Sequence, residues 1–123
     1  MGGLVSSYYA LNLAPKDLIL DVITLGSPLM GTMMAEIGIG KCADEMRRDS
    51  KFILDLNKKM QNCKNVTFYN LASQIDHLII PFDSALPKNQ PQRQCLIKDV
   101  GHNTLLFSKN VNLQICKWLE NIS

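Results

Sequence analysis

Two residues, Asp76 and His102, have the side chains and the positions that acid–base chemistry requires. Each follows a stretch that predicts a β-strand, and two parallel neighbouring strands would bring both residues to the carboxyl edge of a sheet, where open α/β sheets place their sites. A carboxylate that accepts a bond from one imidazole nitrogen fixes the tautomer in which the other nitrogen acts as a base. Gly101 lets the chain turn sharply before His102. The spacing alone is also consistent with an Asp and a His that lie in loops and are either solvated or structural.

The predicted order is helix, strand, helix, strand, strand, helix, and this order favours an α/β fold with a small parallel sheet. The strands are expected over roughly residues 18–25, 65–71 and 94–100. The first helix is predicted almost from residue one until Pro15, because Leu4, Tyr8 and Leu11 recur at helical spacing, although no capping residue introduces it. Ser50 is the expected cap of a second helix, and a third runs from Lys109.

Three segments in order resemble the carboxyl-terminal half of an α/β-hydrolase of the bacterial lipase kind. They are "MGGLVSSYYALNLAPKDLILDVITLGSPLMGT", "SQIDHLIIPFDSA" and "IKDVGHNTLLFSKNVNLQICKWL". Within them "TLGSPLMGT" is similar to the family pattern G-[ST]-P-x-x-G-[ST], Asp76 matches the catalytic acid, and His102 in its V-G-H-x-x-L-L context matches the catalytic base. The resemblance covers essentially the whole chain.

The resemblance also assigns roles to the first three residues. In the family a strand ends in G-H-S-M-G-G, whose serine is the nucleophile on a strained turn into a helix. Met1, Gly2 and Gly3 match the last three residues of that turn, so the serine is expected immediately before residue one. Met1 would then supply an oxyanion-hole amide, and the two elbow glycines would permit close packing of the helix. Residues 1–123 are accordingly expected to form a single, incomplete α/β-hydrolase domain that is inactive alone.

The resemblance implies hydrolysis of lipid or other carboxylic esters by a Ser-His-Asp triad, with no cofactor and no metal. The methionine-rich and glycine-rich segment 29–50 is expected to be a lid-like insert, or a wall for an acyl chain, since flexible thioethers adapt to lipid tails. A loosely packed core helix is the alternative for this segment. The four cysteines have no C-x-x-C pair, so buried free thiols are expected rather than a metal site.

Composition narrows the possible partners. The net charge is only +2 and the basic residues are scattered, which gives little support to nucleic-acid binding. No apolar run approaches the roughly 18 residues of a membrane span, and nothing resembles a signal peptide, so a soluble chain is predicted while its compartment stays open.

Several alternatives stay open at this point. Asp83 is a rival acid in the same loop as Asp76, and His77 is expected to be a loop residue. None of the eight serines has a glycine two residues upstream, so no second G-x-S-x-G is present, and Ser27 is a poor substitute because it stands before Pro28 in a turn. A different class of function is a non-catalytic binding or assembly module, in which an exposed sheet edge recruits a partner, such as the missing half of the domain, or associates with a second copy.

Overall fold

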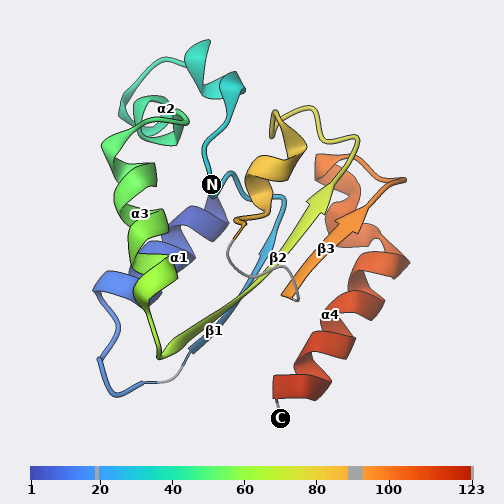
Figure 1. Ribbon diagram of the computed structural model, residues 1–123. Helices are drawn as coiled ribbons and strands as arrows, with labels where there is room; N and C mark the ends of the chain where they lie inside the picture. The colour runs from blue at the N-terminus through green and yellow to red at the C-terminus, as the bar shows by residue number, and fades with distance from the viewer. Residues whose placement is uncertain (19, 89–92, 123) are drawn as a thin grey trace.

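The computed structural model describes residues 1–18, 20–88 and 93–122. Its centre is a three-stranded parallel sheet in the order β1-β2-β3, formed by Leu20–Leu25, Val66–Ser73 and Gln94–Ile97 (Figure 1). Leu20 pairs with Val66, and Asn70 pairs with Gln94. The predicted α/β organisation with a parallel sheet is therefore confirmed.

The strand boundaries differ from the predicted ones. The third strand was expected to reach residue 100, but β3 ends at Ile97 because the next residues bend away from the sheet toward His102. The second strand continues past residue 71 to Ser73, which pairs with Ile97. The first strand begins at Leu20 rather than at residue 18, and residue 19 lies outside the described residues.

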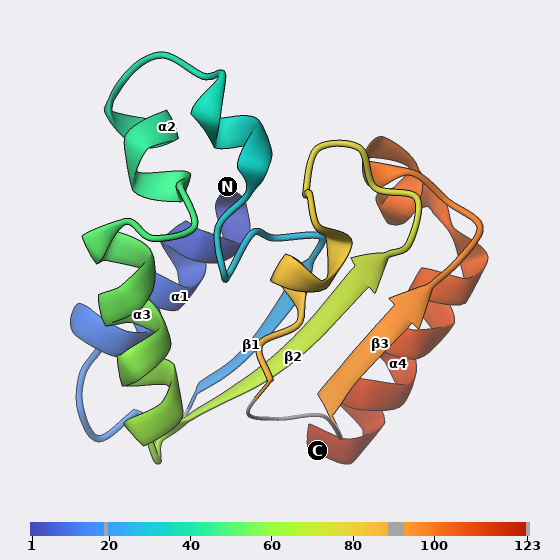
Figure 2. The ribbon, with the colours of Figure 1, turned by 45° about the horizontal axis from the view of Figure 1, so that its top comes forward.

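Helices cover both faces of the sheet and make three layers. On one face lie α1 and α3, and on the other lies α4, with bounds Gly2–Asn12, Lys51–Asn62 and Lys109–Ile122 (Figure 2). The side chains of alternate residues in β2 point to opposite faces of the sheet. Phe68 belongs to the core beneath α1 and α3, while Tyr69 packs against Trp118 of α4. Every residue of β2 except Thr67 is buried, since helices cover it from both sides.

The helices α1 and α3 begin with different capping chemistry. Ser50 caps α3 as predicted, because its hydroxyl accepts a hydrogen bond from the amide of Ile53 at 3.2 Å. The first helix begins at Gly2 without any side-chain cap. Its buried residues are Leu4, Ser7 and Ala10, whereas Tyr8, one of the apolar residues whose spacing predicted the helix, is 41% exposed. Two of the three buried residues, Ser7 and Ala10, have small side chains.

Segment 29–50 folds into short elements at the carboxyl end of the sheet: a 3-10 helix η1 and a short helix α2, which span Met33–Glu36 and Lys41–Met46. Two further 3-10 helices, η2 and η4, follow β2 and β3 and span Phe82–Ala85 and His102–Phe107. Among the described residues, no helix is both long enough and apolar enough to cross a membrane.

Candidate active site

Asp76 and His102 lie side by side at the carboxyl edge of the sheet. The loop after β2 carries Asp76, and the loop after β3 carries His102 at the start of η4. Oδ2 of Asp76 lies 2.7 Å from Nδ1 of His102. Because β2 and β3 are parallel neighbours, residues that follow them emerge at the same edge, which is the physical reason why this pair can form.

The Asp76 carboxylate is buried and held from two sides. Only 7% of the residue is exposed. Oδ1 accepts hydrogen bonds from the backbone amides of Leu78 and Ile79 at 2.8 and 2.9 Å, while Oδ2 faces His102. A carboxylate can be buried when hydrogen bonds satisfy its oxygens. These bonds also fix the orientation of Oδ2 toward the imidazole.

The His102 ring is placed to exchange protons with a molecule outside the fold. Its side chain is 28% exposed, while its Asp76 partner is almost fully covered. The contact with Asp76 engages Nδ1, so Nε2 on the opposite side of the ring is the nitrogen available to a reacting group. An imidazole held in this way can accept a proton at Nε2 and later return it.

Ser73 ties together the two loops that carry the pair. Its side chain is fully buried at the end of β2, and its hydroxyl donates to the carbonyl of Val100, two residues before His102. The same oxygen accepts from the amide of Ile75 at 3.3 Å. The sequence pattern offered no signal for this role, since a serine at a strand end has many possible partners.

A third loop, the one after β1, closes against the pair. Gly26 has φ +56, a conformation that favours glycine, and a Cβ there would lie 3.2 Å from both Asp76 Oδ2 and His102 Nδ1. Sequence reasoning missed this residue, although a glycine directly after an apolar strand was the signal that could have pointed to it. The pair thus sits where the ends of all three strands converge.

The start of α1 reaches the same region through Ser27. A Cβ on Gly3 would lie 2.0 Å from Ser27 Oγ, so glycine is required where the first turn of α1 packs against the loop after β1. Gly2 behaves differently from the expectation, because a Cβ there would meet nothing within 4 Å. The carbonyl of Met1 accepts bonds from the amides of Leu4 and Val5, and burial lowers the pKa of the Met1 amino group. Figure 1 shows the N-terminus level with the carboxyl ends of the strands, below α2.

The other candidates for the acid, the base and the nucleophile are Asp83, His77 and Ser27. Asp83 belongs to η2 and lines a hollow with Arg48 and Lys88, and His102 is not among the residues that line this hollow. His77 is exposed. Ser27 is 4% exposed and packs against Gly3. Geometry therefore favours Asp76 over Asp83 as the partner of His102.

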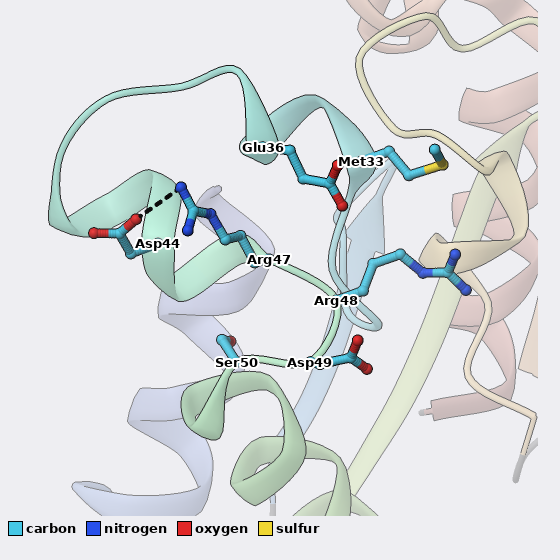
Figure 3. Close-up of a pocket in the computed structure, with 7 residues that line it drawn as sticks. All are labelled: Met33, Glu36, Asp44, Arg47, Arg48, Asp49 and Ser50. Carbon is cyan, nitrogen blue, oxygen red and sulfur yellow. Dashed lines mark ion pairs between the residues drawn. The ribbon is translucent and has the colours of Figure 1, made fainter.

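A hollow of about 600 Å³ lies in segment 29–50 and does not include the pair (Figure 3). Its walls are mainly charged or polar, with Met33 as the apolar exception, and the side chains that line it are Met33, Glu36, Asp44, Arg47, Arg48, Asp49 and Ser50. Asp44 and Arg47 form an exposed ion pair at 3.1 Å. Charged walls suit water or polar groups better than an acyl chain.

Within the described ranges, no group of three or more His, Cys, Asp or Glu side chains is arranged to hold a metal ion. Comparison of the chain with protein-family models and with curated proteins finds no match. The function must therefore be argued from the geometry of the site and from its sequence motifs.

Proposed function

We propose that Asp76 and His102 are the acid and the base of a carboxylic ester hydrolase of the serine type, with lipid or other carboxylic esters as substrates. The observation that carries the proposal is the 2.7 Å contact between Asp76 Oδ2 and His102 Nδ1 at the carboxyl edge of a parallel sheet. On this proposal the sheet is part of an α/β-hydrolase fold, and segment 29–50 is its lid.

The proposed reaction assigns each group one task. As a serine oxygen attacks the ester carbonyl carbon, Nε2 of His102 takes the hydroxyl proton, and the imidazolium then gives that proton to the leaving alcohol. Water hydrolyses the resulting acyl-serine through the same two proton transfers. Asp76 accepts the Nδ1 hydrogen bond throughout and stabilises the imidazolium.

The attacking hydroxyl needs a source, since no serine of this chain stands in a G-x-S-x-G pattern. In the family that the motifs resemble, the nucleophile directly precedes the residue that matches Met1. The contact of Gly3 with the loop after β1 places the start of α1 near the pair, which supports a serine at that position as the partner of His102. The backbone amide of Met1 would then donate to the oxyanion.

A fluorophosphonate probe tests this proposal, because it labels a serine only when a base activates it. We would compare the 123 residues, the same chain preceded by Gly-His-Ser, and a matched form preceded by Gly-His-Ala. Labelling and ester turnover are expected with Gly-His-Ser only. His102→Ala should reduce the labelling rate by about 100-fold or more, the usual contribution of a general base.

His77→Ala is the control, since His77 is an exposed neighbour of Asp76. Labelling that survives His102→Ala, or labelling of the Gly-His-Ala form at the same rate, would overturn the assignment. The assignment would also be overturned if the Gly-His-Ser form reacted with the fluorophosphonate no faster than the free amino acid serine.

A second candidate function, assembly through an exposed sheet edge, is favoured by a separate observation. Among the described strands, β1 has a neighbour on one side only. Beside it lies a groove of about 510 Å³ with mainly apolar walls, formed by Val5, Ser6, Tyr9, Ala10 and residues 20–23. An unpaired strand edge with an apolar flank is suited to pairing with another chain. We propose a second copy of this chain as its partner.

A further inference from the structure

The motif "TLGSPLMGT" ends in Thr32, and the proposed chemistry gives this residue no role. Thr32 is buried, with 4% of its surface exposed, although it stands in the segment that follows β1 rather than in a strand or an α-helix. The large majority of buried hydroxyls have hydrogen-bond partners, so the contacts of Thr32 show which parts of the chain it joins.

The hydroxyl of Thr32 bonds to the loop that carries Asp76. Its Oγ1 donates to the carbonyl of Leu78 at 3.0 Å and accepts from the amide of Ile80 at 3.1 Å. It also accepts from the amide of Met34 at 3.3 Å, at the start of η1. One oxygen therefore joins the segment after β1 to the segment after β2.

Thr32 and the proposed catalytic acid share a peptide unit. The amides of Leu78 and Ile79 donate to Asp76 Oδ1, and the Leu78 carbonyl, in the same peptide unit as the Ile79 amide, accepts from Thr32. The Ile80 amide, in the next unit, donates to Thr32. The backbone amide of Met33 adds a bond to the carbonyl of Ile80 at 2.8 Å. If the Thr32 hydroxyl is removed, the 78–80 turn loses the bonds of Leu78 and Ile80 to Thr32, while Asp76 and His102 remain chemically intact.

We propose that Thr32 is a positioning residue, whose buried hydroxyl fixes the 78–80 turn so that its amides hold the Asp76 carboxylate against His102. The inference rests on the proposed function for its catalytic meaning, but the contact it concerns can be measured without any ester. Thr32 touches neither the imidazole nor a reacting atom. It acts through Leu78 and Ile79.

Hydrogen exchange and proton NMR on the full 123-residue chain test this role. In Thr32→Val, which keeps the shape and removes the hydroxyl, exchange of the Leu78 and Ile79 amides should speed up at least about tenfold, while amides in β2 keep their protection. The hydrogen-bonded Nδ1 proton of His102, expected as a downfield resonance, should be lost or shifted. Asp76→Asn supplies the reference spectrum of a broken contact.

Matched variants separate positioning from general support of the fold. Thr32→Ser keeps the hydroxyl, so the exchange rates of the Leu78 and Ile79 amides and the His102 Nδ1 resonance should stay as in the unmodified chain. Thr67→Val makes the same change in β2 and should also leave both signatures, the exchange rates and the resonance, unaltered. If Thr32→Val does not fold, Thr32→Cys is measured instead, because a thiol is a weaker hydrogen-bonding group of similar size. Thr32→Cys should also speed up exchange of the Leu78 and Ile79 amides and shift the His102 resonance, but by less than is expected of Thr32→Val.

Unaltered exchange and an unaltered His102 resonance in the hydroxyl-deficient variants would overturn the proposal. Equal loss of protection in β2 would also overturn it, because the hydroxyl would then support the whole fold rather than the turn. Failure of the proposed ester chemistry leaves these signatures in place, so the two failures are distinguishable.

Discussion

Gly3 and Ser27 are in direct contact, and the absence of a side chain on Gly3 makes that contact possible. A Cβ on Gly3 would lie 2.0 Å from Ser27 Oγ and 2.6 Å from Ser27 Cβ. The neighbouring Gly26 would in turn bring a Cβ to 3.2 Å from His102 Nδ1. Two glycines thus link the start of α1 to the candidate acid–base pair.

The first prediction concerns the two glycines at the start of α1. Gly3→Ala should destabilise the protein by about 1–3 kcal/mol, because the added methyl group overlaps buried Ser27. Gly2→Ala should be neutral or stabilising by up to about 1 kcal/mol, because its Cβ meets nothing within 4 Å and alanine favours a helix. Urea unfolding measures both values. Equal destabilisation by the two variants would contradict the packing described here.

The second prediction distinguishes the two candidate acids. In the form that carries a serine before Met1, Asp76→Asn should slow labelling by a fluorophosphonate about 100-fold or more, because an amide cannot hold the imidazole in the required tautomer. Asp83→Asn, in the same loop region, should leave the rate within about twofold. A larger effect from Asp83 than from Asp76 would reverse the assignment.

The third prediction concerns the cysteines. Burial raises the pKa of the Cys63 and Cys95 thiols above the ordinary value of 9.0, whereas Cys42 and Cys116 are exposed. Iodoacetamide at pH 8 should therefore modify Cys42 and Cys116 first, because the thiolate is the nucleophile. Peptide mass spectrometry over time shows the order, and early modification of Cys63 would contradict it.

The same two thiols predict a pH dependence of stability. Because their pKa values are raised in the folded state, the unfolded chain releases these protons at a lower pH than the folded chain. Their contribution to the free energy of unfolding is fully present below pH 9.0 and is lost as the pH rises through the folded pKa values. Urea unfolding between pH 8 and 10 measures this loss, and Cys63→Ser with Cys95→Ser should reduce it. An unchanged pH dependence in that double variant would contradict the prediction.

The fifth prediction addresses the groove beside β1. Val5 and Tyr9 are 62% and 52% exposed on its wall, so Val5→Glu with Tyr9→Glu should preserve the fold but weaken self-association at least about tenfold by placing charge in the contact. Light scattering after gel filtration measures the extent of self-association. Leu113→Glu, at a 58% exposed site on α4, is the control and should change nothing. If the control and the groove variant behave alike, this edge is not the interface.

Local patterns were enough to predict much of the fold. Apolar and β-branched runs located the three strands, Ser50 located the start of α3, and the spacing after Lys109 located α4. They failed where a tertiary contact outweighed local spacing. The apolar spacing that predicted α1 runs through Leu4, Tyr8 and Leu11, whereas the fold buries Leu4 together with the small residues Ser7 and Ala10.

The sequence by itself determined which residues could do the chemistry, since Asp76, His102 and the motifs around them are visible as types and spacings. Their relation to one another was decided by the tertiary structure. Hydrogen-bond pairing of β2 with β3 brings two distant loops to one edge, where the Gly26 backbone and the buried hydroxyls of Ser73 and Thr32 contact the loops that carry the carboxylate and the imidazole. Such contacts join residues far apart in the chain, and no local pattern encodes them.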